Sequence, residues 1–169
     1  MRRWTVLATM LAAAAVAPAR AADLEIEVHG VLAGNGEIRA ALFDNAADFQ
    51  KAVDMRAMIT QTGQVSTGWF PQDERTGRML ARMLSVAADG PVVRVRYANV
   101  QPGEYAVGLF QDLNGDWKLD GDFSRNAREP WGISNNPKPE ARPPTWEEAR
   151  FAIPSEGLSI LIRLVRQNP

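Results

Sequence analysis

Apolar and polar residues alternate along several short segments of this chain. A period of two is the pattern of a β-strand that buries one face and exposes the other. It predicts strands at residues 23–29, 37–43, 92–97, 104–110 and 158–165, with a further short strand at 151–153. So many strands and so little helical pattern predict an all-β fold, a single β-sandwich of about seven strands with one or two short helices.

One face of these strands is expected to form a core between two sheets. The strand at 104–110 carries few polar residues on either face, so we expect it to lie in the middle of its sheet. The predicted core consists of Leu24, Ile26, Ile38, Leu42, Val93, Val95, Val107, Leu109, Ile160 and Ile162.

Two turns predict how neighbouring strands are connected. The Gly-Asn-Gly segment at 34–36 tolerates positive φ and predicts a tight hairpin between the first two strands. Pro102 and Gly103 suit the second and third positions of a type II turn. A second hairpin is therefore predicted between the strands at 92–97 and 104–110.

Two segments carry the capping residues of short helices. Apolar residues recur at helical spacing within 44–58, directly after Asn45, which is a favourable N-cap. Thr145 and Glu148 have the spacing of a capping box, in which each side chain satisfies an orphan backbone donor. This spacing predicts one helical turn at 145–150.

The middle of the chain, residues 54–91, is the part whose pattern is hardest to interpret. No element is predicted for 60–76, which is rich in Gln, Thr, Gly and Ser. The segment from Arg78 to Ala88 combines helical propensity with apolar residues at helical spacing, and a helix is predicted there. Met79 and Val86 would also fit a strand.

Residues 1–21 have the organisation of a secretory signal peptide. Two arginines precede an apolar run from Trp4 to Val16, and Ala19-Arg20-Ala21 is a small-x-small cleavage site. The run is shorter than the ~20 residues that a helical membrane span needs. We therefore expect a periplasmic or secreted protein with no membrane span after cleavage and one domain at residues 22–169.

The composition excludes several kinds of chemistry. Loss of the three arginines of the leader would change the formal charge from −1 to −4. The sequence has no cluster of basic residues of the kind that binds nucleic acid. The chain has no cysteine and a single histidine, His29, on the expected wet face of the first strand. Thiol catalysis, cysteine-zinc sites and histidine clusters are therefore excluded.

One cluster of candidate ligands stands out, in the segment QDLNGDWKLDGDF at 111–123. Oxygen side chains at every second position can surround a hard cation, and the spacing matches positions 1, 3, 5 and 9 of an EF-hand loop. Trp117 stands where the loop needs glycine, and Phe123 stands where it needs a bidentate Glu. The candidate Ca2+ ligands are Asp112, Asn114, Asp116, the Lys118 carbonyl, Asp120 and Asp122.

The alternative for this segment is a solvated turn without metal. Asp112 and Asn114 would then accept hydrogen bonds from nearby backbone amides. Carboxylates alone do not specify acid and base catalysis, and no nucleophile elbow is recognisable, so we expect a non-catalytic module. A metal-assisted envelope hydrolase remains the less favoured enzymatic alternative.

The tryptophans suggest a way of binding. Exposed indoles can contact glycans or partner proteins of the envelope. Trp131 is expected to anchor a loop to the core, whereas Trp117, among polar neighbours, is expected to be the most exposed. Trp69 and Trp146 are the remaining candidates.

Several motifs resemble a family of uncharacterised exported bacterial proteins, domain of unknown function 2141. They are GEIRAALFD, PGEYAVGLFQDLNGDWKLD, GISNN and the segment 144–151, and together they span nearly the whole mature chain. The resemblance implies a prealbumin-like or immunoglobulin-like β-sandwich and no assigned activity. The chain departs from the family pattern at 54–91, which is longer, and at Trp117, where a second glycine is expected.

Overall fold

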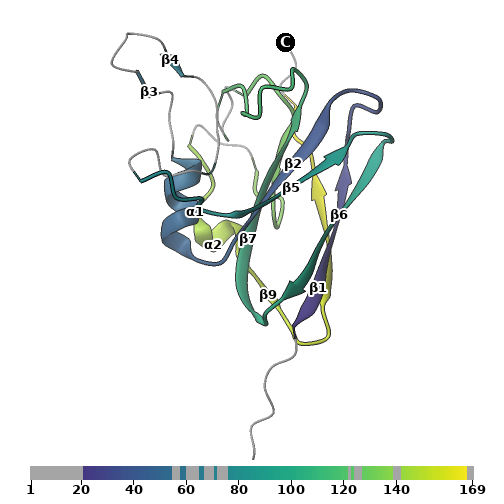
Figure 1. The fold of residues 1–169 in the computed structure, drawn as a ribbon, viewed down its shortest axis with the longest axis vertical. Helices are drawn as coiled ribbons and strands as arrows, with labels where there is room; N and C mark the ends of the chain where they lie inside the picture. The colour runs from purple at the N-terminus through teal and green to yellow at the C-terminus, as the bar shows by residue number, and fades with distance from the viewer. Residues whose placement is uncertain are drawn as a thin grey trace, which may run out of the picture.

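The strands of this protein form two packed sheets with two short helices on one side (Figure 1). The computed structural model describes residues 21–54, 58–59, 65–66, 71, 76–121, 123, 127–138 and 142–166. All of the predicted signal peptide except Ala21, and most of 60–76, lie outside these residues. The predicted all-β sandwich is confirmed. Within the described part of the chain, no helix is both long and apolar enough to cross a membrane.

The first sheet has three strands in the order β10-β1-β6. β1 runs antiparallel to β6 and parallel to β10, so the two ends of the domain pair side by side. Their bounds are Ala22–His29 for β1, Val92–Val100 for β6 and Leu158–Arg163 for β10.

The second sheet has five strands, with β7 at its centre as predicted. Its main order is β5-β2-β7-β8, and β9 pairs with the start of β7. A separate small pair joins β3 to β4. The bounds are Glu37–Phe43 for β2, Met58–Ile59 for β3, Val65–Ser66 for β4, Arg82–Ala87 for β5, Gly103–Asp112 for β7, Trp131–Ile133 for β8 and Phe151–Ile153 for β9.

The main core lies between the sheets and confirms the residues predicted for it. All of them are buried except Ile160, which is half-buried against the same cluster. A second apolar cluster lies on the other face of the five-stranded sheet, beneath α1 and α2. β7 contributes Leu109 to the first cluster and Phe110 to the second. The five-stranded sheet is therefore buried on both faces, which explains why β7 has so few polar residues.

Both helices begin where their capping residues predict. α1 (Ala46–Val53) starts after Asn45, whose side chain accepts a hydrogen bond of 2.8 Å from the Asp48 backbone N–H. α2 (Trp146–Ala149) follows Thr145, whose backbone N–H donates to the Glu148 carboxylate at 2.8 Å. Each cap satisfies a donor that has no partner within the helix.

Both predicted hairpins are wrong, because each turn connects strands of different sheets. β2 pairs with β5 and β7, whereas β1 pairs with β6 and β10, so β1 and β2 face each other across the core. β6 and β7 are separated in the same way. Gly103 does not have the positive φ of the predicted type II turn, and Asn99 takes that conformation instead, with φ of 57°. Local turn chemistry permits reversal of the chain but does not choose the strand's partner.

The helix predicted at 78–88 is also wrong, since this segment contains β5. β5 pairs with β2 along its length, and Ala40 lies opposite Leu84. Leu84 and Val86 then pack at period two against the core between the sheets. Ladder bonds and burial together outweigh the modest helical propensity of the segment.

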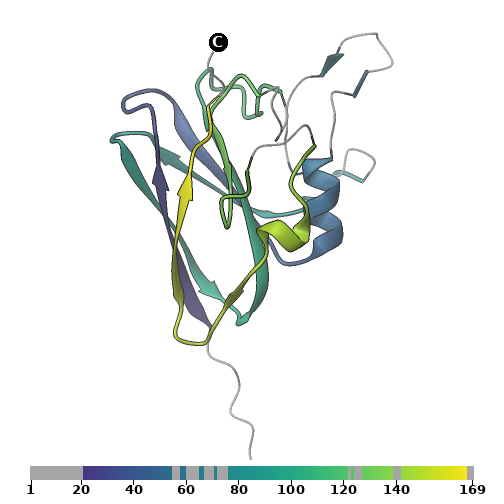
Figure 2. The same cartoon turned by 180° about the vertical axis from the view of Figure 1, so that it is seen from behind.

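The sheets are joined along one side, where β8 meets the end of β10 (yellow at the front of Figure 2). Trp131 and Val165 exchange backbone hydrogen bonds of 3.1 and 2.7 Å. Beside this bridge, the Asn136 side chain donates to the Leu161 carbonyl at 2.9 Å and accepts from the Arg163 amide at 2.6 Å. The Asn136 amide thus takes the place of a neighbouring strand along β10.

Candidate functional site

The Asp-rich loop, residues 112–120, begins with a buried carboxylate at the end of β7. Asp112 is fully buried and accepts a hydrogen bond of 3.1 Å from Nε of Arg39 on β2. Arg39 is itself almost completely buried, and its guanidinium also contacts Glu37 at 2.8 Å and Ser85 at 2.5 Å. A protein cation therefore neutralises the first candidate calcium ligand.

The loop wraps its own backbone amides around its acidic side chains. Asp112 accepts from the amides of Gly115 at 2.7 Å and Trp117 at 3.1 Å. Asn114 accepts from the amide of Asp116 at 3.0 Å, and Asp116 accepts from the amide of Lys118 at 2.9 Å. The side-chain-to-backbone turns predicted for Asp112 and Asn114 are confirmed.

Trp117 covers the buried guanidinium from the solvent side. Cζ of Arg39 lies 3.6 Å from the centroid of the Trp117 ring, a close cation–π contact. Trp117 nevertheless remains 53% exposed, and its φ of 68° is the left-handed conformation that a glycine would adopt more easily. The predicted exposure of Trp117 is confirmed, and its stacking on Arg39 offsets part of the backbone strain.

Glu129 supports the loop from a second segment. It is only 4% exposed and accepts hydrogen bonds from the amides of Leu113 at 2.7 Å and Asp120 at 3.0 Å. Burial raises the pKa of Glu129, and the carboxylates of Asp120 and Asp112 act in the same direction, against the two amide hydrogen bonds that lower it. Glu129 thus fixes both ends of the Asp-rich loop.

Sequence reasoning missed both Arg39 and Glu129. Arg39 could have been found as the one charged residue between apolar neighbours on β2, because a charge on a buried face requires a partner. Glu129 stands between Arg128 and Pro130 in a segment without periodicity, and its sequence context gives no comparable signal.

The candidate calcium ligands differ in their surroundings. Asp112 is buried, Asp120 is half-buried, and Asn114, Asp116 and Lys118 are exposed. Asp122 lies outside the described residues. In the part of the chain that the structure describes, no group of three or more His, Cys, Asp or Glu side chains is placed to hold a metal ion. The loop brings Asp112 and Asp120 toward Glu129, and the oxygens of Asp112 and Glu129 take hydrogen bonds from protein donors.

The other tryptophans do not extend this surface. Trp131 is 1% exposed and packs edge-to-face against Phe123, which confirms it as a core anchor. Trp146 is half-buried and contacts Phe49 in α1. Trp69 lies outside the described residues. Among those that are described, Trp117 is the exposed tryptophan.

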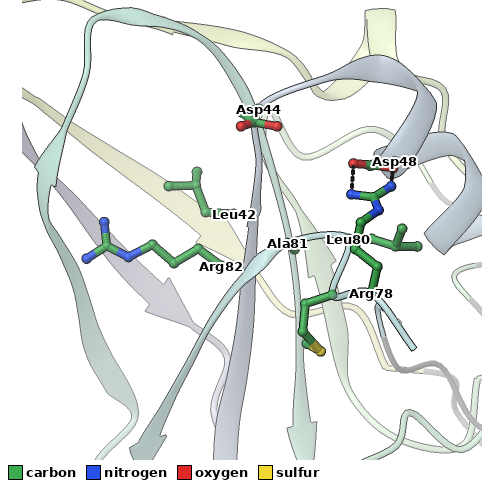
Figure 3. Close-up of a pocket in the computed structure, with 8 residues that line it drawn as sticks. Leu42, Asp44, Asp48, Arg78, Leu80, Ala81 and Arg82 are labelled. Atoms are coloured by element: carbon green, nitrogen blue, oxygen red, sulfur yellow. Dashed lines mark hydrogen bonds and ion pairs between the residues drawn. The ribbon is translucent and has the colours of Figure 1, made fainter. Parts of the chain in front are cut away.

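A separate shallow hollow of about 170 Å³ lies between β2 and the segment before β5 (Figure 3). Arg78 contacts Asp48 there through both guanidinium nitrogens, at 2.5 and 2.9 Å. The hydrogen bonds from Arg78 hold the pKa of Asp48 below its usual value. Asp48 is thus an ionised partner of Arg78, and it is not poised to donate a proton as a catalytic acid would be.

Comparison with known proteins gives a family and no activity. A family model described as an uncharacterized protein conserved in bacteria, domain of unknown function 2141, matches residues 26–160. The matched range runs from β1 into β10 and includes Arg39, Glu129 and the whole Asp-rich loop. No curated protein and no solved structure gives a significant match.

Proposed function

This chain belongs to the bacterial family of domain of unknown function 2141, and we propose that it is an exported, non-catalytic binding module of the cell envelope. The binding element is the Asp-rich loop, and its ligand is a partner protein of the envelope. Export is supported by the signal-peptide pattern of residues 1–21, which is typical of proteins sent to the periplasm or out of the cell.

The observation that carries this proposal is the presence of two exposed apolar side chains on a rigidly supported loop. Trp117 is 53% exposed and Leu113 is 40% exposed. Their loop is tied down by the buried Asp112–Arg39 pair and by Glu129. A preorganised loop loses little conformational entropy on binding, and tryptophan is among the residues that contribute most at protein interfaces.

A partner protein suits these two side chains better than a glycan. Leu113 adds an exposed aliphatic side chain to the loop that carries Trp117, and apolar contacts are typical of the centre of protein interfaces. A glycan platform of several tryptophans is not formed among the described residues, because Trp131 is buried and Trp146 is half-buried.

The test compares substitutions on the loop with a matched one elsewhere. Immobilised protein would be incubated with a solubilised envelope fraction, and the retained proteins would be identified. Trp117→Ala and Leu113→Ser should lose a partner that the unmodified protein retains. Val92→Ser, at a similarly exposed apolar residue on β6, should keep it. Equal retention by all variants would contradict the proposal, and the same pattern obtained with purified peptidoglycan would replace the protein partner with a glycan.

A second candidate function for the same loop is the binding of one Ca2+ ion. The observation that favours it is that Asp120 and Asp112 lie close enough to Glu129 for their charges to act on it, since the pKa of Glu129 is raised by burial and, to a smaller extent, by these two carboxylates. A cation near Asn114, Asp116, the Lys118 carbonyl and Asp120 would relieve this repulsion. The Arg39 guanidinium beside Asp112 already supplies one positive charge, which weakens the need for a metal.

Thermal melting in chelator and in millimolar calcium tests this candidate. A ligand that binds only the folded protein stabilises it by about 2.7 kcal/mol at a hundredfold excess over its dissociation constant. A higher midpoint with calcium that Asp116→Ala abolishes would support the site. Equal midpoints in chelator, magnesium and calcium would reject it. Hydrolysis of an envelope glycan that Asp116→Asn abolishes would instead support the metal-assisted hydrolase.

A further inference from the structure

The outer edge of β5 is a second interaction surface, separate from the Asp-rich loop. β5 is the last strand of the five-stranded sheet on the side away from β8, and its ladder bonds go to β2. Figure 1 shows β5 beside β2. The opposite side of the sandwich is closed, because the Trp131–Val165 bridge and the Asn136 amide occupy the free edge of β10. The edge at β10 therefore has hydrogen-bond partners within the chain.

The pairing with β2 determines which backbone groups of β5 point outward. The amide of Ala88 donates to the carbonyl of Gly36, so residue 88 is directed toward β2. Successive residues of an antiparallel strand alternate between the two sides. The N–H and C=O groups of Met83, Ser85 and Ala87 therefore point away from β2, and no described residue forms a hydrogen bond with them.

β5 lacks the features that usually protect an edge strand. Its pairing with β2 continues without a bulge from Arg82 to Ala87, and residues 83–88 contain neither proline nor a charged side chain. Met83, Leu84 and Val86 are only half-buried, although they pack against the two apolar clusters. A regular, uncharged and partly apolar edge is a template for pairing with another strand.

We propose that β5 is a dimerisation edge, which pairs antiparallel with β5 of a second copy of this chain about a two-fold axis at Ser85. In this register Ser85 faces the partner's Ser85, and Met83 faces the partner's Ala87. All the outward backbone groups then meet donors and acceptors of the other copy. The contact is isologous, so one surface serves both subunits and the assembly closes as a dimer.

The charges of β5 permit a second copy as the occupant and give a foreign peptide no charged group to recognise. Arg82 is the one charged residue of β5, and the proposed register places it opposite the partner's Ala88, so no like charges face each other. The stretch 83–88 offers no charge with which to select a foreign strand. Self-pairing would also bury more of the half-buried Leu84 and Val86 side chains of both copies.

The first test removes an outward donor without affecting the bonds to β2. Sedimentation of the purified protein over a range of concentrations should show a monomer–dimer equilibrium. Ala87→Pro should weaken the dimer by roughly tenfold or more, since each copy loses an N–H that points to the partner. Ala87→Thr keeps the N–H and should dimerise like the unmodified protein. A monomer at all concentrations, or equal dimerisation of the two variants, would overturn the proposal.

The second test uses the absence of cysteine from the chain. Residues in a hydrogen-bonded antiparallel pair have Cα atoms about 5.5 Å apart, which is within the range that a disulfide can join. Ser85→Cys should therefore form a cross-linked dimer in oxidised glutathione, and its melting temperature is measured alongside because the substitution removes the hydroxyl that accepts a hydrogen bond of 2.5 Å from Arg39. Ser159→Cys, at a serine on β10 that is also exposed, should cross-link far more slowly. Equal rates for the two variants would contradict the proposed register, even if Ala87→Pro failed to fold.

This inference does not rest on the function proposed for the Asp-rich loop, although the Ser85 hydroxyl accepts a hydrogen bond of 2.5 Å from Arg39, which supports that loop. A monomeric protein whose partner binding depends on Trp117 would overturn the dimer alone. A dimer that retains the same envelope proteins with and without Trp117→Ala would overturn the proposed function alone.

Discussion

Trp117 stacks on Arg39, with Cζ of the guanidinium 3.6 Å from the centroid of the indole ring. The two residues come from separate elements, since Arg39 belongs to β2 and Trp117 follows β7. The buried carboxylate of Asp112 links the same two residues, because it accepts hydrogen bonds from the Arg39 guanidinium and from the Trp117 backbone amide. This contact fixes the conformation of a loop that sequence patterns alone would describe as a solvated turn.

Removal of Arg39 should strongly destabilise the fold. Arg39→Ala would leave Asp112 as a buried charge without its cation, and such changes cost about 3–5 kcal/mol in the free energy of unfolding. Arg94→Ala is the control, because Arg94 pairs with Glu27 at the surface and such pairs contribute about 0–1 kcal/mol. Urea unfolding measures both. Similar losses for the two variants would contradict the importance of the buried pair.

The backbone conformation of Trp117 predicts an unusual order of stabilities. Trp117→Gly and Trp117→Ala both lose the contact with Arg39, but glycine adopts a φ of 68° without the strain of a β-carbon. The glycine variant should therefore be the more stable of the two, by about 1 kcal/mol. Thermal or urea unfolding measures the difference. A more stable alanine variant would show that the left-handed conformation is not maintained in solution.

Gly36 allows the turn before β2 to approach the Asp-rich loop. A β-carbon at Gly36 would lie 1.8 Å from the Asp112 carbonyl oxygen, whereas one at Gly34 would meet no atom within 4 Å. Both glycines have positive φ, so their substitution by alanine shares the same kind of backbone strain. Gly36→Ala should lower the melting temperature much more than Gly34→Ala. Equal effects would exclude the steric contribution.

The cap of α2 should make stability depend on acidic pH. Hydrogen bonds from Arg142 and then from the Thr145 amide lower the pKa of Glu148 from 4.5 to about 2. A lowered pKa contributes stability above the pKa of the unfolded state, and this contribution is lost as the pH falls from about 4.5 to about 2. The advantage of the unmodified protein over Glu148→Gln should shrink across this window in urea unfolding. A constant difference would contradict the coupling.

Tyr97 carries a buried hydroxyl without a hydrogen-bond partner among the described residues. An unsatisfied buried donor costs about 1–3 kcal/mol, so Tyr97→Phe should be neutral or stabilising. Tyr105→Phe is the matched control, because the Tyr105 hydroxyl donates to the Gln101 carbonyl at 2.9 Å. Calorimetric melting of both variants measures the difference. A large destabilisation by Tyr97→Phe would point to a bound internal water.

The candidate site could be predicted in part. The turns made by Asp112 and Asn114 and the exposure of Trp117 follow from local spacing and polar neighbours, and the structure confirms them. The burial of Asp112 could not be predicted, because it depends on Arg39 and Glu129, which lie far away in the sequence. The pattern of acidic residues was visible, but the groups that neutralise them were not.

The sequence by itself determined where β1, β2, β6, β7, β9, β10 and the two helix caps lie. Alternation of burial is a property of consecutive residues, so the period of two located β2 and β9 with their observed bounds. The N-cap at Asn45 and the capping box at Thr145 each act within a single helical turn, so both could be recognised from the sequence.

Only the tertiary structure decided which strands pair. β1 and β2 belong to different sheets despite their short connection, and β5 is a strand although its residues favour a helix. The physical reason is that a strand's hydrogen bonds and half of its burial come from residues distant in the chain. The energy of those contacts exceeds the local preferences that a sequence pattern records.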